Sequence, residues 1–406
     1  MNKEIKNFSL KNHIKKNFFK TKLYKKDKIK LDRVIKKIYK DIDIKKNTYH
    51  VLSKKFVYNF SKSSLKNFLK YKSVVVIGMG GSSLGAKAIY SFLKKKSKRK
   101  FIFFDNLDEL KIIETKKKIN LNNSLFIIIS KSGNTIETLI NTNLLKDKIS
   151  SKNAIIITEQ KNNLLSNYAK TKKILQINHN DYIGGRFSVL SEVGIVPAFF
   201  MGLKINSFRE NILSFSNLKR NSILTESVVK LAHIYSLKKI RSIILLNYAP
   251  QLNDFLFWCQ QLTAESLGKK NIGILPVVSP APRDHHSLLQ LYLDGPKDKL
   301  FYIFSIDVNK SMKTNDKIFS KPFRFVENKK ISKIIDSQKK ALIEVLKKKK
   351  IPFREFRINK TNEKVLGELF SYFILETTLV ASVLDINPFN QPAVEEIKNL
   401  TKRYLS

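Results

Sequence analysis

The segment Val74–Gly85 reads VVVIGMGGSSLG and indicates the fold class of the chain. Its first four residues form a continuous β-branched run, which predicts a strand buried on both faces, as in a parallel sheet covered by helices. A glycine turn follows, and then apolar residues recur at helical spacing from Ala86 to Leu93. The segment therefore predicts a strand, loop and helix unit of an α/β domain.

Short apolar runs of the same kind recur along the chain and predict further strands. In the first half they are Lys100–Phe104, Leu125–Ile129, Ala154–Thr158 and Lys173–Ile177. Beyond a connecting region near Gly202–Asn221 they are Arg241–Leu246, Ile272–Pro276, Leu300–Ile306 and Pro352–Ile358. Helical patterns such as Asn253–Leu267 and Asp336–Lys347 separate several of them. We therefore expect two doubly wound parallel-sheet domains, each a three-layer α/β/α structure.

These patterns divide the chain into four parts. Apolar residues at helical spacing, among them Leu31, Val34, Ile35 and Ile38, predict a helical N-terminal arm over residues 1–50. The first domain is expected over residues 51–206 and the second over residues 207–384. Residues 385–406 are expected to carry a final helix over Gln391–Leu405 that returns to the active site, which we expect in the crevice between the domains.

Composition narrows the class of protein. With 406 residues, of which 43 % are hydrophobic, the chain is expected to fold into a globular enzyme. The longest apolar runs, such as Val193–Leu203, fall short of the roughly 18 to 20 residues that cross a bilayer, so no membrane partner is expected. The N-terminus lacks a secretory signal pattern, and the single cysteine, Cys259, excludes an internal disulfide. These features predict a cytoplasmic protein.

The net charge of +44 would by itself suggest a nucleic-acid partner. The excess is mostly lysine spread along the whole chain, whereas nucleic-acid domains concentrate arginine and aromatic residues on one face. We therefore expect no nucleic-acid partner, and we expect a basic field that attracts a phosphorylated substrate.

The glycine loop from Gly78 to Gly85 suits close approach of an anion, because glycines admit it and the next helix begins there. A dinucleotide loop is an alternative, with Asp105 following the second strand at slightly longer spacing than that motif expects. A plain tight turn is another.

The run Ser130–Thr138 reads SKSGNTIET and again follows a strand. It places four hydroxyls and a glycine where the chain enters a helix, a composition that can wrap a phosphate monoester. The alternative, ordinary capping of the helix by one Ser or Thr, explains one hydroxyl and leaves three without a reason. The run lacks the Gly-Lys-Ser/Thr pattern of a nucleoside triphosphate loop.

Two further stretches offer charged side chains. Gly184-Gly185-Arg186-Phe187-Ser188 sets a lone arginine behind two glycines, which suggests a role that needs the fixed fork of the guanidinium rather than a surface turn. Glu265 closes an apolar helical pattern before a Gly-Lys turn, where its carboxylate can be a general base, although an exposed helical glutamate is the common outcome.

Together with Phe389–Lys398, which reads FNQPAVEEIK, these stretches resemble the phosphoglucose isomerase family, built from two sugar-isomerase (SIS) domains. The order and spacing of these stretches match the family pattern from about Ser73 to Lys398. The first 50 or so residues match nothing in that pattern. The resemblance implies glucose-6-phosphate isomerase activity in glycolysis and gluconeogenesis, without a cofactor or metal. The implied reaction interconverts an aldose phosphate and a ketose phosphate through a cis-enediol.

The resemblance also implies the substrate-binding residues. Side chains of the 130–138 run would hold the phosphate, and backbone groups and turns would lie beside the sugar. Glu137 and Gln391 would orient the sugar and the catalytic groups. The full implied set is Gly81, Ser82, Ser130, Lys131, Ser132, Thr135, Glu137, Thr138, Gly185 and Gln391.

Four catalytic residues follow from the same resemblance. Glu265 would move the proton between C2 and C1, and Arg186 would face the developing enediolate as a permanent, preorganised charge. His286 and Lys398 would open the sugar ring, since histidine titrates near neutral pH. The family brings this histidine from the partner subunit, so the resemblance implies a homodimer with His286 at the interface.

The choice of His286 over His285 rests on the Ser-x-x-Gln pattern that follows them. A metal site at the two histidines is an alternative, but neighbours in an extended segment point to opposite faces and no third ligand stands nearby in sequence. The stretch Pro280–Arg283 before them does not map onto the family pattern.

Three rival functions remain at this level. A non-catalytic SIS module that senses sugar phosphates would have no need of Glu265, Arg186, His286 and Lys398 together. A basic nucleic-acid-binding protein would bind DNA in a salt-dependent way. An isomerase that also accepts mannose 6-phosphate would share most of the machinery described above.

Overall fold

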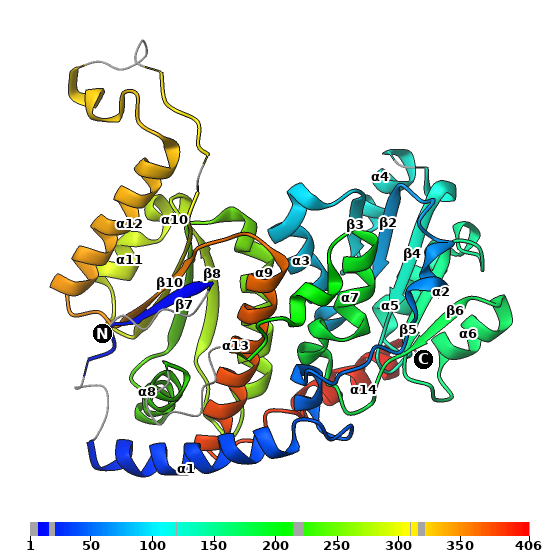
Figure 1. Cartoon of the computed structure of the whole chain (residues 1–406), viewed down its shortest axis with the longest axis horizontal. Helices are drawn as coiled ribbons and strands as arrows, with labels where there is room; N and C mark the ends of the chain where they lie inside the picture. Colours follow the sequence, from blue (N-terminus) through cyan, green and yellow to red (C-terminus); the bar gives the residue numbers. More distant parts are fainter. Residues whose placement is uncertain are drawn as a thin grey trace.

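The computed structural model describes residues 7–15, 21–118, 120–213, 223–308, 310–315 and 321–405. These residues form two β-sheets with helices packed on them, and the two halves of the molecule lie side by side (Figure 1). The α/β class with two parallel-sheet halves, predicted from the continuous apolar strands, is confirmed.

The first sheet is parallel throughout the part of the chain described, in the order β3-β2-β4-β5-β6. Every residue of β4 and β5 is buried, as continuous apolar strands between two helical layers must be. The strands are β2 (Ser73–Ile77), β3 (Lys100–Phe104), β4 (Ser124–Ile129), β5 (Ala154–Thr158) and β6 (Leu175–Asn178). The helices of this half are α2 (Lys62–Lys66), α3 (Leu84–Leu93), α4 (Glu109–Lys118), α5 (Ile136–Leu144), α6 (Leu164–Lys172) and α7 (Glu192–Phe200).

The second sheet has the order β1-β10-β9-β7-β8, with β1 antiparallel at one edge and the other strands parallel. Its strands are β7 (Ser242–Asn247), β8 (Leu275–Pro280), β9 (Lys299–Ile306), β10 (Phe353–Ile358) and β1 (Phe8–Asn12). Its helices are α8 (Ile223–Leu237), α9 (Asn253–Leu267), α10 (Arg283–Ser287), α11 (Leu289–Asp294), α12 (Ile331–Lys348) and α13 (Glu363–Val383).

Both halves share one topology. The first strand of each parallel set lies inside its sheet, β2 between β3 and β4, and β7 between β8 and β9. Successive strands are therefore added first on one side of β2 and then on the other, so the strand order reverses between β2 and β4. The same reversal occurs between β7 and β9. In doubly wound sheets such a switch point opens a crevice at the carboxyl ends of the strands, where ligands bind. The fold thus offers two such edges.

Helix α13 is long and apolar enough to cross a bilayer, which corrects the expectation that no apolar run approaches that length. Its apolar stretch is 94 % buried inside the molecule, where it packs on α8 and α9. Glu376 on this helix accepts hydrogen bonds from Arg354 of β10 and from Tyr372, and all three side chains are buried. These contacts identify α13 as the core helix of the second half.

The N-terminal region differs in part from its prediction. The spacing of Leu31, Val34, Ile35 and Ile38 predicted a helix, observed as α1 (Thr21–Asp41). The expectation of a helical arm is wrong for Phe8–Asn12, which forms β1 and pairs with β10, Phe8 opposite Ile358. Phe8 and Leu10 are buried, whereas the residues between and after them are not. This alternation is typical of a strand. Residues 1–6 and 16–20 of the predicted arm lie outside the described residues.

Two predicted strands begin later than expected. Residue Lys173 has a φ of 52° and ends α6, so β6 starts at Leu175. Lys270 and Asn271 likewise have φ values of 53° and 56° in a tight turn, so β8 starts at Leu275. The remaining strands fall within a residue of the predicted bounds at either end.

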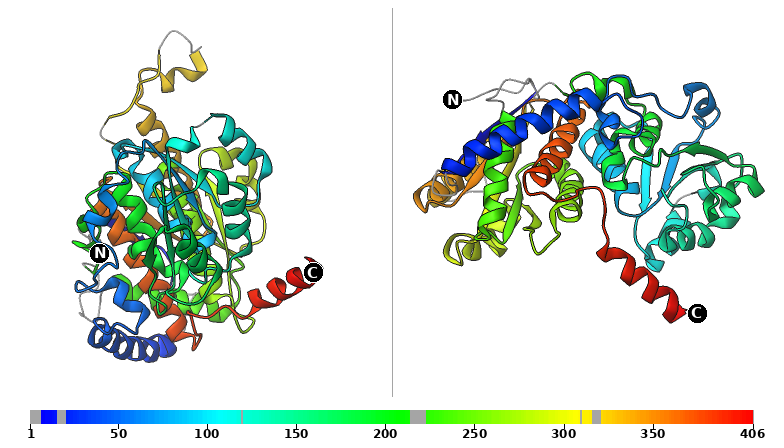
Figure 2. Two further views of the ribbon diagram at one scale, coloured as in Figure 1. Left: turned by 90° about the vertical axis from the view of Figure 1, so that its right-hand side faces the viewer. Right: turned by 90° about the horizontal axis from the view of Figure 1, so that it is seen from below.

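The predicted final helix is observed as α14 (Ala393–Leu405). It projects from the body of the molecule (Figure 2), and its described side chains are exposed, among them the apolar Ile397, Tyr404 and Leu405. An amphipathic helix with its apolar side in water normally packs against another surface.

Candidate active site

The candidate site lies at the carboxyl edge of the first sheet. Strands β2 and β4 are paired neighbours, so the glycine loop after β2 and the Ser130–Thr138 loop after β4 emerge next to each other. This is the switch point of the first half.

Backbone contact joins the glycine loop to the Gly-Gly-Arg segment. The 3₁₀ helix η3 (Gly80–Ser82) packs on the 3₁₀ helix η7 (Gly185–Leu190). A Cβ on Gly81 would meet the carbonyl group of Gly185 and lie 2.7 Å from the amide nitrogen of Arg186. A Cβ on Gly185, in contrast, would meet no described atom within 4 Å. The first glycine permits the contact, and the second borders open space.

Arg186 is the centre of the site, with only 3 % of the residue exposed. Each of its five N–H donors reaches a protein acceptor. The acceptors are Ser266 Oγ for Nε (3.0 Å), Glu265 Oε2 and Gln391 Oε1 for Nη1 (both 2.9 Å), and the backbone oxygens of Pro388 and Asn390 (the latter at 3.0 Å) for Nη2. One guanidinium thereby binds η7, α9 and the segment before α14 together.

Glu265 lies near the C-terminal end of α9, which ends at Leu267 and is capped by Gly268. Its carboxylate is fixed on both oxygens, since Oε2 accepts from Arg186 and Oε1 accepts from Gln261 Nε2 at 2.9 Å. Its side chain nevertheless remains 29 % exposed. The structure therefore holds a carboxylate at a partly open position beside a buried cation.

Burial and nearby charges shift the pKa of two basic side chains of the site, Arg186 and Lys269. Burial lowers the pKa of the Arg186 guanidinium, and the Glu265 carboxylate opposes that shift. Burial also lowers the pKa of Lys269 to about 8, with repulsion from Arg186 adding to the shift and Glu265 opposing it. Lys269 donates to the backbone oxygen of Asn387 at 2.6 Å, so it supports the same C-terminal segment as Arg186.

The Ser130–Thr138 loop presents hydroxyls as the sequence predicts. Ser130 Oγ and Thr135 Oγ1 lie 2.9 Å apart, and Gly133, with a φ of 68°, donates its N–H to Ser130 Oγ at 3.2 Å. Thr135 precedes α5 without a side-chain capping bond, which disfavours the alternative of ordinary N-capping for this residue. Thr138 Oγ1 is buried and has no hydrogen-bond partner within the described chain, an unusual state for a buried hydroxyl.

Other predicted substrate-binding residues lie on the same edge. Ser132 is exposed and accepts from the N–H of Asn134, while Glu137 lies half-buried in the first turn of α5. Ser82 is half-buried in η3. Lys131 turns its amino group to the backbone oxygen of Asp181 at 2.6 Å, and burial lowers its pKa.

Two predicted catalytic residues lie elsewhere in the single chain. His286 is exposed on α10, which packs on β8 and α11 in the second half. Lys398 lies on α14, in the projecting segment of Figure 2, and its side chain is exposed. The single chain thus brings together Arg186, Glu265 and Gln391 but leaves these two residues apart from them.

The two adjacent histidines differ in their surroundings. His285 Nε2 lies 2.7 Å from Tyr248 Oη, and burial together with the charge of His286 lowers the pKa of His285. Both residues lie on a helix, where neighbours differ by about 100°, so the premise of an extended segment is wrong. In the described parts of the chain no three His, Cys, Asp or Glu side chains gather into a metal site.

Sequence reasoning missed several residues of the site. Gln261 lies one turn before Glu265 on α9, a spacing that predicts contact on one face of a helix. Ser266 follows Glu265 directly and accepts from Arg186, a contact that helix spacing does not predict. His179 follows β6, where Nε2 donates to the backbone oxygen of Ile183 at 3.0 Å and burial lowers its pKa to about 4. It shapes the turn that leads to Gly185. No sequence pattern marked this histidine.

Known proteins are similar to this chain in both sequence and fold. The family model for phosphoglucose isomerase matches residues 27–406. The chain is 34 % identical to a glucose-6-phosphate isomerase of Methanocaldococcus jannaschii over 365 residues, 86 % of this chain and 88 % of the relative. It is 32 % identical to a glucose-6-phosphate isomerase of Campylobacter jejuni, over 82 % of this chain and 86 % of the relative. A solved glucose-6-phosphate isomerase of Chlamydia trachomatis superposes with a TM-score of 0.79 at 17 % identity, over all of this chain and 89 % of the other, which shows the same fold.

The glycine contact gives a matched pair of substitutions. Gly81→Ala should separate η3 from η7 and lower both the free energy of unfolding and the isomerase activity, because its Cβ meets backbone that cannot move aside. Gly185→Ala should keep the stability within about 1 kcal/mol and weaken substrate binding, since its methyl group enters open space at the site. Chemical denaturation and steady-state kinetics measure both. Equal loss of stability in the two variants would contradict the assignment of the contact.

The buried His179 predicts a pH dependence. Its pKa of about 4 in the folded chain lies below the ordinary histidine value of 6.5, so between these pH values the unfolded chain binds more protons. The free energy of unfolding should therefore fall as the pH drops from 6.5 to 4. His179→Gln keeps a donor for the oxygen of Ile183 and does not titrate, so its pH dependence should be shallower by up to about one proton. Identical slopes for the two proteins would refute the claim.

Proposed function

The chain belongs to the phosphoglucose isomerase family, and we propose that its Glu265 is the base of a glucose-6-phosphate isomerase. The enzyme is an aldose-ketose isomerase that interconverts glucose 6-phosphate and fructose 6-phosphate, a step of glycolysis and gluconeogenesis. Its substrate is a sugar phosphate. The observation that carries the proposal is the Arg186–Glu265 pair, a fixed and partly exposed carboxylate at the edge of the first sheet.

In this mechanism the carboxylate of Glu265 takes the proton from C2 of the open-chain aldose. The electron pair of the broken C2–H bond forms the C1–C2 double bond, and O1 takes the negative charge. A proton passes from O2 to O1 by way of the cis-enediol, and the same carboxylate returns its proton to C1 as C2 becomes the carbonyl carbon, so that one C–H bond breaks and another forms. A carboxylate that acts as a general base must be held against the carbon whose proton it takes. The bonds of Glu265 to Arg186 and Gln261 supply this placement.

We assign the phosphate to the hydroxyls of Ser130, Ser132, Thr135 and Thr138. The buried Oγ1 of Thr138 without a partner among the described residues supports this assignment, because a phosphate oxygen would satisfy it. The start of α5 adds backbone N–H donors and the positive end of the helix dipole. The pairing of β2 with β4 connects this loop to the glycine loop, and the contact of η3 with η7 connects the glycine loop to Arg186.

The sugar is then expected over Gly185 and beside the Gly81–Ser82 turn. The open space above Gly185 supports this position. The backbone of Lys131 and the side chain of Glu137 come from the neighbouring loop after β4 and would orient the sugar.

Arg186 acts in this scheme as a permanent charge that holds Glu265 in place. Because all five of its donors have protein acceptors, a direct hydrogen bond to the enediolate requires one acceptor to leave. Gln391 is the neutral side chain among these acceptors that lies in the segment before α14, and we assign it that exchange. The positive charge stabilises the enediolate over a short distance in a partly dry site even before the exchange.

Ring opening is assigned to His286 and Lys398, with His286 supplied by a second copy of the chain. His286 is exposed and lies apart from Arg186 in its own chain, whereas His285 contacts Tyr248. The exposed apolar residues of α14 also favour a second copy as their cover. We place this homodimer in the cytoplasm, in agreement with a single buried cysteine.

A coupled assay with fructose 6-phosphate tests the base. Wild type should turn over without added metal or nucleotide, and Glu265→Gln should lose about 10²- to 10⁴-fold in kcat while it still binds substrate, because a general base contributes that much. Glu226→Gln, on α8 in an ion pair with Lys230, is the matched control and should retain the wild-type rate. Full activity of Glu265→Gln would remove Glu265 from this role.

A separate assay tests the dual-specificity alternative. It supplies mannose 6-phosphate to the wild type and measures the formation of fructose 6-phosphate.

Mixed dimers test the shared histidine. Glu265→Gln and His286→Ala homodimers should both be impaired, whereas coexpression should restore about a quarter of the wild-type sites, since half of the dimers then hold one intact site. Restoration requires Glu265 of one chain to meet His286 of the other. No gain over the two separate variants would mean that His286 acts within its own chain or not at all.

A further inference from the structure

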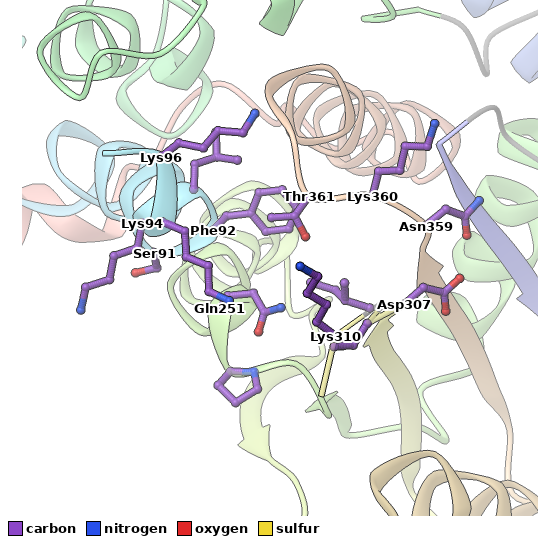
Figure 3. A pocket seen from close by; sticks show the side chains of 15 residues that line it. Ser91, Phe92, Lys94, Lys96, Gln251, Asp307, Lys310, Asn359, Lys360 and Thr361 are labelled. Carbon is purple, nitrogen blue, oxygen red and sulfur yellow. The ribbon is translucent and has the colours of Figure 1, made fainter. Parts of the chain in front are cut away.

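A second pocket lies at the carboxyl edge of the second sheet, apart from the Arg186 site. Its volume is about 1150 Å³, and its lining residues follow β7, β9 and β10 or close α3 (Figure 3). The strand order places it at the β7/β9 switch point, the counterpart of the β2/β4 edge that carries the proposed substrate site. The fold rule for ligand crevices therefore applies to this edge as well.

The pocket is strongly cationic. Lys94, Lys95 and Lys96 of the 3₁₀ helix η4 (Lys94–Lys96) line one side, and Lys310 and Lys360 follow β9 and β10. Lys96 is paired with Glu363 at 2.6 Å, but the other four lysines have no ion-pair partner within the described residues. Figure 3 shows the Lys310 side chain turned toward the middle of the lining residues.

The acidic side chain of the lining does not cancel this charge. Asp307 binds Arg357 at 2.7 Å and is thereby neutralised. An uncompensated group of lysines around a concave site concentrates anions.

Backbone and neutral side chains complete an anion site. Pro250 and Gln251 lie in the 3₁₀ helix η9 (Pro250–Leu252), which leads into α9, and Thr361 precedes the N-cap of α13. Two long helices therefore begin at this edge, each with one acidic residue in its first turn, Asp254 and Glu363. Gln251, Asn359 and Thr361 add neutral hydrogen-bonding groups. These features suit phosphoryl oxygens, which accept several hydrogen bonds at once.

The lining also has apolar surface. Val308 is 51 % exposed and Ile306 is half-buried in the lining, and the volume exceeds the range of about 300–1000 Å³ typical of small-molecule sites. A single inorganic phosphate would leave most of this space empty. The charge of several lysines and the size together select a ligand with more than one phosphoryl group.

We propose that this pocket binds a small polyphosphorylated anion, either a sugar carrying two phosphates or a linear polyphosphate, at a site separate from the substrate site. The pocket lies between the edge of the second sheet and the end of α3 with η4 from the first half, and the proposal does not depend on the isomerase mechanism. The lysines of the pocket bind the phosphoryl groups, and the apolar wall receives the uncharged part when the ligand is a sugar ester.

Calorimetric titration at low ionic strength tests the proposal, with tripolyphosphate in one arm and fructose 1,6-bisphosphate in the other. Wild type is compared with Lys310→Glu/Lys360→Glu. The matched control, Lys170→Glu/Lys172→Glu, carries the same charge change on exposed lysines of α6 in the first half. Binding at the Ser130–Thr138 loop is common to the three proteins, so their comparison isolates the pocket.

The pocket variant should bind at least one probe about tenfold or more weakly than the control variant, and added salt should weaken the wild-type interaction. Its isomerase kcat should match that of the control, since neither lysine belongs to the substrate site. Loss in the sugar arm alone identifies a sugar ester, and loss in the tripolyphosphate arm alone identifies a linear polyphosphate. Equal isotherms for the two variants, or no binding of either probe to wild type, overturn the proposal.

Discussion

The architecture of the site depends on one buried cation. Arg186 is almost fully inaccessible to water, and such a charge is stable only when its donors are satisfied and its charge is paired. It meets that requirement with acceptors from α9 and from the segment before α14. The same bonds that stabilise the charge therefore fix the carboxylate of Glu265, so the stability of this region and the geometry of the base have one origin.

The two halves share one topology, but their switch points carry different kinds of side chain. At the β2/β4 edge, hydroxyls and glycines form a neutral cradle beside a buried arginine, which suits a single phosphate held in a fixed orientation. At the β7/β9 edge, exposed lysines line a pocket of about 1150 Å³. Core helix α13 and helix α9 lie between the two and give each edge a rigid support.

Sequence patterns revealed most of the fold because parallel strands buried on both faces leave continuous apolar runs, as in Val74–Ile77. They missed β1, since Phe8–Asn12 is a short alternating edge strand whose partner, β10, lies some 340 residues away along the chain. Motifs located Arg186 and Glu265, but no motif shows that backbone oxygens of Pro388 and Asn390 complete the guanidinium shell. Such contacts depend on tertiary packing and leave no mark in residue type.

Arg186 and Glu265 act as a unit in this mechanism, and a double-mutant cycle in kcat tests that coupling. Arg186→Lys, Glu265→Gln and the double variant are compared with wild type in the same assay. If the arginine works through the placement and charge of the base, the double variant should be about as slow as the slower single variant, because the second change removes nothing further. Losses that multiply across the two positions would show independent roles and would contradict the account.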